Sequence, residues 1–299
     1  MGGSSLTSEA LPGMITAVGQ KFNCSLLSYL KTFELDRASQ HKFVDLRVDP
    51  FPAPRFVTAC SSNHIEGALR LIRIIGERFP QQKLLLYGLT LNDTEVELLK
   101  SYSNVDFRWF RFDLYPPHVK DLLNYAWKIL IIAETLKEFG AVWWLDVSVV
   151  FRKGGDLERN YALLKCRNLS DRPRAYTYFP VREHVVKGQR MFGATIMLAV
   201  RTSEVVESVM KWATLCALER DCIAPEGARL CCRFKGKADD RFHNYAGCHR
   251  YDQSVFNVLL SNQFQSQYNW TGGPTDFFTI SRLPEPPELI QKKSNCDDT

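Results

Sequence analysis

Strand-like and helix-like segments alternate along residues 55–151, and this alternation constrains the fold more than any other feature of the sequence. Arg55–Cys60 has the apolar composition of a strand, and Ile65–Phe79 has the amphipathic spacing of a helix. The pattern continues with strand, helix, strand, helix and strand at Lys83–Leu89, Asp93–Tyr102, Val105–Phe112, Val119–Phe139 and Ala141–Phe151. Such an alternation predicts βαβ units. The sequence therefore predicts an α/β fold with a mainly parallel sheet flanked by helices.

The same criteria divide the chain into three parts. Residues 1–50 show little periodicity and form a predicted N-terminal extension, which Pro52 and Pro54 separate from the rest. Residues 51–280 form one predicted domain, regular over 55–151 and looser over 152–280, and residues 281–299 form an irregular tail. In the looser half we expect irregular structure from Gln265 onward, preceded by a strand and two helices at Met191–Val200, Ser203–Leu218 and Asp252–Phe264.

Asp146 interrupts the apolar strand-like segment Ala141–Phe151, whose sequence is AVWWLDVSVVF. A carboxylate is costly to bury without a partner, so a strand that serves only the core has no reason to carry one. In open α/β sheets, ligands bind beyond the carboxyl ends of the strands, which is where Asp146 is expected to lie. The plain alternative is that Asp146 caps the next turn. We therefore treat Asp146 as the first candidate for a functional residue.

The charge of the chain argues against a nucleic-acid partner. The formal net charge is +5, and the basic residues are scattered rather than clustered. A site for an anionic ligand remains compatible with this balance. The sequence contains no apolar run long enough for a membrane span, and residues 1–20 lack the pattern of a signal peptide.

Cysteines and glycosylation sequons favour the lumen of the secretory pathway, either the Golgi or the route to secretion. Five of the nine cysteines fall between Cys216 and Cys248. We expect at least one disulfide there, while zinc is the weaker alternative because no C-x-x-C spacing is present. Four sequons begin at Asn23, Asn92, Asn168 and Asn269, which predicts a glycoprotein.

Four segments resemble the motifs of one enzyme family, in order along the chain. Trp144–Phe151 resembles the strand and Asp-x-Asp motif of GT-A glycosyltransferases, with Ser148 in place of the last aspartate. Val57–Asn63 resembles their first strand and nucleotide-facing loop, Phe192–Met197 the strand that faces the donor sugar, and Tyr251–Asn257 their Asp-Gln helix start. Trp212–Asn257 also resembles, more narrowly, a group of glycosyltransferase-like proteins expanded in nematodes.

The resemblance covers about residues 55–280 and implies a GT-A type, Rossmann-like sheet. Residues 55–151 would bind the nucleotide, and the cysteine-rich part of residues 152–280 would lie on the acceptor side. It implies a nucleotide-sugar donor, and Mn²⁺ or Mg²⁺ held by Asp146 and Ser148. It also implies a set of donor-binding residues, namely Thr58, Ser61, Asn63, Asp146, Ser148 and Gly193.

Asp252 and Gln253 are the candidate catalytic pair. Near a reacting sugar carbon, a carboxylate or amide stabilises an oxocarbenium-like transition state, binds a hydroxyl or acts as a nucleophile. Asp252 as a plain helix N-cap is an equally good interpretation of the spacing alone. We expect both residues to share a site with Asp146.

Taken together, these features predict a glycosyltransferase that moves a hexose from a nucleotide sugar, in particular a UDP-sugar, to a glycan or glycoprotein acceptor. The alternative is a GT-A-like module that has lost the chemistry and binds a glycan or a protein partner. Ser148, which replaces an expected acid, is the feature that favours this alternative.

Overall fold

The computed structural model describes residues 19–154, 178–179, 191–230, 248–264 and 277–282. Within these residues the centre of the fold is a five-stranded sheet in the order β3-β2-β1-β4-β6. The first four strands in the chain are parallel, and β6 is antiparallel to β4. A separate antiparallel pair joins β5 to β7. The strands are β1 (Arg55–Cys60), β2 (Leu84–Gly88), β3 (Val105–Trp109), β4 (Ala141–Leu145), β5 (Val149–Phe151), β6 (Ile196–Val200) and β7 (Phe278–Ile280).

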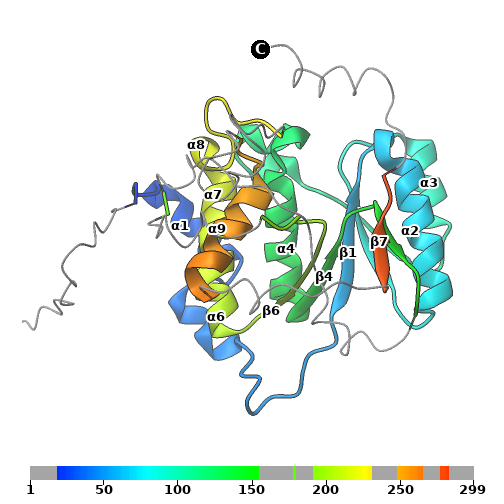
Figure 1. The fold of residues 1–299 in the computed structure, drawn as a ribbon, viewed down its shortest axis with the longest axis horizontal. Helices are drawn as coiled ribbons and strands as arrows, with labels where there is room; N and C mark the ends of the chain where they lie inside the picture. The colour runs from blue at the N-terminus through cyan, green and yellow to red at the C-terminus, as the bar shows by residue number, and fades with distance from the viewer. Residues whose placement is uncertain (1–18, 155–177, 180–190, 231–247, 265–276, 283–299) are drawn as a thin grey trace, which may run out of the picture.

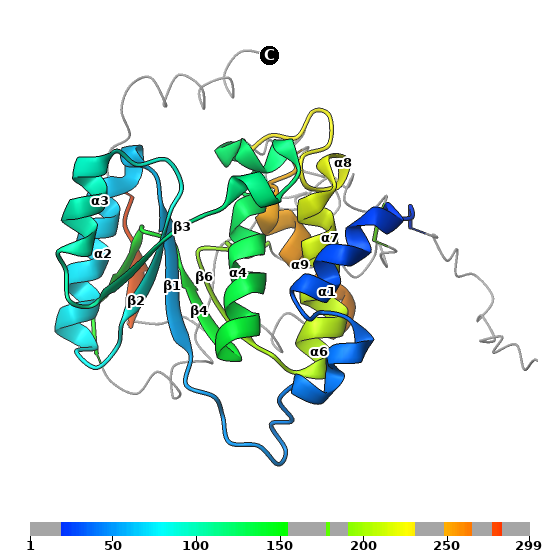
Figure 2. The ribbon, with the colours of Figure 1, turned by 180° about the vertical axis from the view of Figure 1, so that it is seen from behind.

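Helices cover both faces of the central sheet, as Figures 1 and 2 show from opposite sides. Helices α2 and α3 lie on one face, and α4, α7 and α9 lie on the other. The helices are α1 (Leu27–Thr32), α2 (Ile65–Arg78), α3 (Asp93–Lys100), α4 (Ala126–Phe139), α6 (Ser203–Val205), α7 (Lys211–Leu218), α8 (Arg220–Ile223) and α9 (Asp252–Phe264). The prediction of an α/β fold with a mainly parallel, helix-flanked sheet is confirmed.

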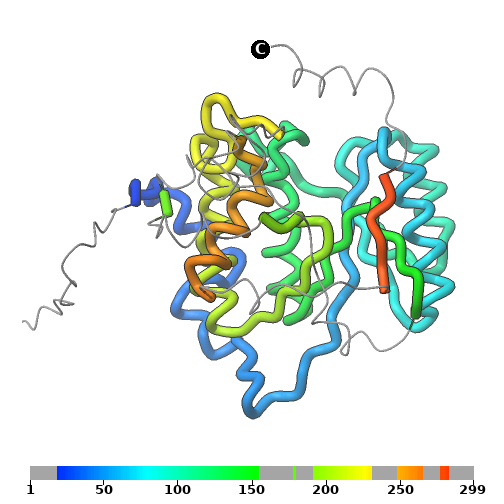
Figure 3. Tube along the Cα trace, in the orientation of Figure 1, coloured from blue at the N-terminus to red at the C-terminus, as the bar shows by residue number. Residues whose placement is uncertain are grey.

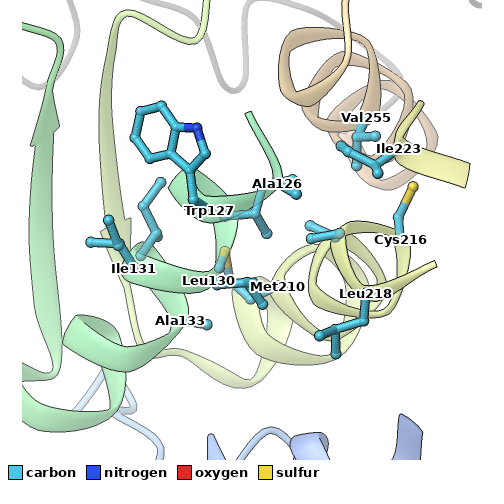
Figure 4. Close-up of a cluster of buried hydrophobic side chains, with 14 of the residues drawn as sticks. Ala126, Trp127, Leu130, Ile131, Ala133, Met210, Cys216, Leu218, Ile223 and Val255 are labelled. Carbon is cyan, nitrogen blue, oxygen red and sulfur yellow. The ribbon is translucent and has the colours of Figure 1, made fainter. Parts of the chain in front are cut away.

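Successive residues of each strand enter opposite layers of the core, because side chains alternate across a β-sheet. Phe56 and Trp143 belong to the apolar cluster around α2, whereas Val57 and Trp144 belong to the cluster around α4, α7 and α9. Figure 4 shows part of the second cluster, where side chains of α4 meet those of the neighbouring helices. Asp146 lies two residues beyond Trp144, so the same alternation directs its side chain toward the α4 side.

Residues that we assigned to the N-terminal extension also contribute to this core. Side chains of α1 and of the turns before and after it are buried, and α1 contacts α7 at the N-terminal, dark blue end of the described chain in Figure 3. The buried side chains are Leu26, Leu30, Phe33 and Leu35. The first part of the described chain therefore packs against the same layer as α4 and α7.

The predicted strand Ala141–Phe151 is wrong after Leu145. The chain turns at residues 146–148, where the Val149 amide donates to the Asp146 carbonyl over 3.0 Å. It then enters a different sheet, because β5 pairs with β7 rather than with a neighbour of β4. This turn places Asp146 at the carboxyl end of β4, beyond the last buried residue of the strand.

The helix predicted from Val119 begins only at Ala126. The preceding residues form 3₁₀ turns, and Tyr125 adopts a left-handed backbone with φ of 55°. The Asn124 side chain stabilises this start, because it accepts from the Ala126 amide over 2.9 Å and donates to the His118 carbonyl over 2.6 Å. The predicted C-cap is confirmed, since Gly140 ends α4 with φ of 73°, a conformation that suits glycine.

Three further boundaries differ from the prediction. The strand predicted from Met191 begins at Ile196, and the strand predicted to end at Phe112 ends at Trp109. The region predicted to be irregular from Gln265 onward contains β7 in its described part. The start of α3 is as predicted, because Asn92 forms a capping box with Glu95.

The cysteine-rich region contains the expected disulfide chemistry. Cys216 and Cys222 form a disulfide that links α7 to α8, and Cys248 is also disulfide-bonded. Among the described residues, Cys24 and Cys60 are free thiols. The prediction of at least one intrachain disulfide between Cys216 and Cys248 is therefore confirmed.

Replacing both Cys216 and Cys222 by alanine should lower the free energy of unfolding by about 2 kcal/mol, because the bridge no longer restricts the unfolded chain. The closed loop is short, with a sequence separation of 6, so the loss should stay modest. Denaturant unfolding under non-reducing conditions measures it. Cys24→Ala, which removes an exposed free thiol, is the control and should leave stability unchanged. Equal stability of all three proteins would contradict a stabilising bridge.

Candidate functional site

The side chain of Lys128 brings three distant segments together. Its Nζ lies 3.0 Å from Asp146 Oδ1, at the end of β4, and 2.9 Å from Asp252 Oδ2, at the start of α9. It also donates a hydrogen bond of 3.0 Å to the carbonyl of Ala194, in the segment before β6. The side chains of Lys128 and Asp252 are only 4% and 6% exposed. A buried lysine thus joins two acids that are 106 residues apart in the sequence.

Asp146 is held at the edge of this arrangement. Its Oδ1 accepts a hydrogen bond of 2.8 Å from Trp144 Nε1 in addition to the Lys128 contact. Its amide donates to the Thr195 carbonyl over 2.8 Å. The side chain is 30% exposed, and Oδ2 has no hydrogen-bond partner among the described residues. Asp146 therefore presents one carboxylate oxygen that a ligand can reach.

Asp146, Lys128 and Asp252 form a charged trio. Two tyrosines with left-handed backbones flank it. Tyr125 and Tyr251 have φ of 55° and 52°, and each immediately precedes the helix that carries a member of the trio. Their rings lie 6.2 Å apart. Non-glycine residues pay a conformational cost in this region, and such strain concentrates at functional sites. The strain occurs at the starts of α4 and α9, which position Lys128 and Asp252.

Burial and the neighbouring charges shift the pKa values of Lys128 and Asp252. Burial disfavours the ammonium of Lys128, but Asp146 and Asp252 outweigh it, so the pKa of Lys128 is raised. Burial raises the pKa of Asp252 above its usual value, although Lys128 acts in the opposite direction. When all three groups are ionised the trio carries one net negative charge. Lys128 therefore remains a cation, and Asp252 is the group whose charge is most costly to bury.

Asn257, on α9, binds the backbone of the segment that leads into β6. Its Oδ1 accepts from the Phe192 amide, and its Nδ2 donates to the Phe192 carbonyl, both over 2.7 Å. The amide thereby satisfies both backbone groups of Phe192, in the segment before β6, while β6 itself begins at Ile196 because its partner β4 ends opposite it at Leu145. Gly193 follows directly and is half-buried, next to the Ala194 carbonyl that Lys128 binds.

Other residues predicted to bind the donor lie at the end of β1. Thr58 is fully buried, and its hydroxyl donates to the Leu145 carbonyl over 2.6 Å, so it ties β1 to β4. Ser61 is buried and donates to Asn63 Oδ1 over 2.6 Å, with His64 Nδ1 at 3.3 Å. The trio does not include these residues, and their donor-binding role stays a prediction.

Gln253 and Ser148 lie close in sequence to the two acids of the trio. Gln253 is half-buried directly after Asp252, and Ser148 is half-buried two residues after Asp146. The Ser148 carbonyl accepts from the Ser281 amide over 2.8 Å, which anchors the turn to the end of β7. The structure thus brings Asp146 and Asp252 together, and the roles of Gln253 and Ser148 stay predictions.

The described residues are a poor fit for the divalent cation predicted at Asp146 and Ser148. Mn²⁺ and Mg²⁺ prefer about six oxygen ligands, several of them charged. The turn offers one uncommitted carboxylate oxygen and one neutral hydroxyl, while the Lys128 ammonium lies 3.0 Å from the other oxygen of the same carboxylate. That ammonium repels a cation bound at Asp146. Within the described ranges, no group of three or more His, Cys, Asp or Glu side chains is arranged to hold a metal.

His249 lies near the same helix start and gives a pH-dependent prediction. Burial lowers its pKa from 6.5 to about 4, and its Nε2 bonds the Ile223 carbonyl over 3.0 Å. The unfolded chain therefore binds the proton more readily, so the stability contribution is present above pH 6.5 and is lost as the pH falls toward 4.

Lowering the pH from 7 to 5 should cost about 2 kcal/mol of unfolding free energy through His249. His249→Gln keeps an N–H donor for Ile223 but does not titrate, so this part of the pH dependence should disappear. Denaturant unfolding of both proteins at the two pH values measures the difference. Parallel pH profiles would contradict the assignment.

Residues 10–133 match a family described as "Protein of unknown function (DUF1647)". No curated protein matches the chain. None of the described helices is long and apolar enough to cross a membrane.

Three solved structures resemble the chain at low sequence identity. An active-site mutant of LgtC is 12% identical, with a TM-score of 0.30, over 49% of this chain and 57% of its own length. The bifunctional glycosyltransferase WbbM is 14% identical, with a TM-score of 0.40, over 72% of this chain and 39% of its own. The galactosyltransferase LgtC with donor and acceptor sugar analogues is 12% identical, with a TM-score of 0.39, over 82% and 96%. TM-scores this low do not assign a function, so the geometry of the site has to support one.

Proposed function

We propose that this chain transfers a hexose from a nucleotide sugar, in particular a UDP-sugar, to a hydroxyl of a glycan or glycoprotein. The observation that carries the proposal is the meeting of Asp146 and Asp252 on the buried Nζ of Lys128. It lies at the carboxyl end of β4, the edge at which open α/β sheets bind their ligands.

Stability alone does not explain why three charged side chains are brought together here. Burying ions carries a desolvation cost, and well-packed apolar residues of similar volume are often as stabilising as a buried ion pair. The backbone strain at Tyr125 and Tyr251 adds a second cost at the same place. A site that has to hold carboxylates in a fixed geometry gives a reason for both costs.

The motifs that resemble GT-A glycosyltransferases meet at this point. Trp144–Ser148 and Tyr251–Asn257 are far apart in the sequence, yet Lys128 joins their aspartates and Asn257 binds the segment of Phe192. The order of motifs along the chain and their contact in space are independent observations. Their agreement supports the resemblance.

Hexosyl transfer makes specific demands on such a site. The bond from the anomeric carbon to the diphosphate oxygen breaks, a bond to the acceptor oxygen forms, and the proton of the acceptor hydroxyl passes to the departing diphosphate. Asp146, with one reachable oxygen, would bind a donor hydroxyl. Asp252, fixed by Lys128, would stabilise the positive charge that develops at the anomeric carbon. Gln253 would contribute a hydrogen bond to the sugar.

A thermal-shift screen of nucleotides and UDP-sugars tests the proposal. A ligand that binds the native state raises the melting temperature by mass action. We expect UDP and at least one UDP-hexose to stabilise the wild type, and Asp146→Asn to weaken this shift while its own melting temperature holds. Equal shifts in both proteins would remove Asp146 from the donor site.

The alternative function is a binding module without catalysis. Ser148 in place of an acid favours it, because a neutral hydroxyl is a weaker ligand than a carboxylate. Release of UDP from a UDP-sugar by the wild type excludes this alternative. A location in the Golgi lumen or outside the cell belongs to the same proposal, since four sequons and the disulfide support it.

A further inference from the structure

The trio leaves the proposed donor site short of positive charge. When both acids are ionised they carry two negative charges against the one positive charge of Lys128, and even with Asp252 protonated Asp146 balances Lys128. The Lys128 Nζ donates a hydrogen bond to the Ala194 carbonyl and forms ion pairs with both carboxylates. Lys128 is therefore engaged with the two acids of its own site rather than with a phosphate. A nucleoside diphosphate needs another cation at this place.

The pairing of β5 with β7 brings a guanidinium to the turn of Asp146. Val149 pairs with Ile280, and the Ser281 amide donates to the Ser148 carbonyl over 2.8 Å. The next step of this antiparallel register places Arg282 beside Val147, the residue that follows Asp146. Figure 1 shows β7 at the end of the described chain, beside the α2 face of the sheet.

A second arginine fixes the backbone that carries Arg282. The guanidinium of Arg70, on α2, donates to the Ser281 carbonyl and to the Ser281 hydroxyl. It also reaches the Val147 carbonyl over 3.5 Å, so it holds both sides of the pairing. Arg70 is thus committed to structure. Arg282 is exposed and forms no hydrogen bond or ion pair with another described residue.

The charge of Arg282 also acts on Tyr125, next to the trio. Burial and then Asp252 raise the pKa of Tyr125 to about 12, and Arg282 acts in the opposite direction on the same phenol. The Tyr125 ring lies 5.5 Å from Lys128 Nζ, on which the Trp144 ring also packs at 5.4 Å. Arg282 therefore belongs to the electrostatic surroundings of the trio, although it is distant in the sequence.

We propose that Arg282 binds the diphosphate of the donor and supplies the positive charge that a divalent cation would otherwise provide. This inference rests on the proposed function and specifies how its site binds the anion. A guanidinium suits the role because it binds phosphate oxygens through two parallel N–H donors and stays charged at any working pH. The donor site would then bind nucleotide in the absence of metal.

Calorimetric titration with UDP, with uridine as the uncharged probe, tests this inference. The wild type should bind UDP in EDTA with an affinity within about threefold of that in Mn²⁺. Arg282→Ala should weaken UDP binding by about 10- to 100-fold and leave uridine binding unchanged, because charge-assisted hydrogen bonds to the phosphates are lost. Arg152→Ala is the matched control, since Arg152 is exposed at the opposite end of β5 and should not matter.

The outcomes separate this inference from the proposed function. UDP binding that is unchanged in Arg282→Ala, or that vanishes in EDTA and returns with Mn²⁺, overturns the role of Arg282 while donor binding stands. UDP binding that depends on Arg282 without any sugar transfer supports the anion site and overturns the transferase. A wild type that binds no UDP under either condition overturns both.

Discussion

Lys128→Met should lower the free energy of unfolding by about 3–5 kcal/mol at pH 7, the cost of breaking a buried ion pair by removing one partner. Methionine keeps the length of the side chain but leaves the carboxylate of Asp252, only 6% exposed on its side chain, without its cation. Denaturant unfolding measures the loss. The variant should still fold, because the apolar clusters on both faces of the sheet stay intact.

The pH dependence of this loss identifies its cause. Without Lys128 the pKa of Asp252 rises further above 3.8, so the folded state prefers the protonated acid and stability falls as the pH rises. The deficit of Lys128→Met should therefore be smaller at pH 5 than at pH 7. Adding Asp252→Asn should restore part of the stability, since the uncompensated charge is gone.

A matched control exists on the same helix. Lys137 is 40% exposed on its side chain, lies 3.9 Å from Glu34 and donates to the Thr32 carbonyl. Lys137→Met should cost less than about 1 kcal/mol, as is usual for exposed pairs. A loss in Lys128→Met that is no larger, or that does not depend on pH, would contradict the account of a charged centre.

Asp252→Asn should reduce sugar transfer by about 10²- to 10³-fold while UDP affinity changes little. The amide keeps the shape of the acid but cannot stabilise positive charge at the anomeric carbon. Lys128 retains its contacts with Asp146 and Ala194, so the fold should persist. An interaction made chiefly in the transition state lowers kcat far more than it changes nucleotide binding.

The control for this variant is Asp93→Asn, an exposed aspartate at the first position of α3. It makes the same chemical change at a helix start on the opposite layer of the fold and should leave transfer unaffected. An equal loss of transfer in both variants, or a loss of UDP affinity that accounts for the whole effect in Asp252→Asn, would assign Asp252 a structural or binding role instead.

Local patterns predicted the regular half of the fold well. Strand β1 and the Gly140 cap lie where the sequence places them, because alternation and left-handed glycine are local properties. The errors arise where residues far apart in the sequence determine the bounds and pairing of a strand. Strand β6 starts opposite the last residue of β4, and β5 leaves the central sheet to pair with β7, more than a hundred residues later. No local pattern carries that information.

Part of the candidate site can be predicted from charged residues that interrupt apolar runs. Asp146 interrupts one apolar run and Lys128 interrupts another, AWKILIIA, so the same local signal marks both residues although only Asp146 is among the predicted site residues. Only the resemblance to GT-A glycosyltransferases makes Asp252 a candidate, because its position alone is explained equally well by a helix cap. Arg282 could not be found locally, because only the pairing of β7 brings it to the turn.

Hydrogen exchange of backbone amides with and without a UDP-hexose tests the central claim most directly. If the meeting point of Asp146, Lys128 and Asp252 is the donor site, ligand should slow exchange in residues 146–148, 191–195 and 251–253, and Asp146→Asn should weaken that protection. Slower exchange confined to other segments, or none at ligand concentrations that saturate binding, would contradict the assignment of the donor site.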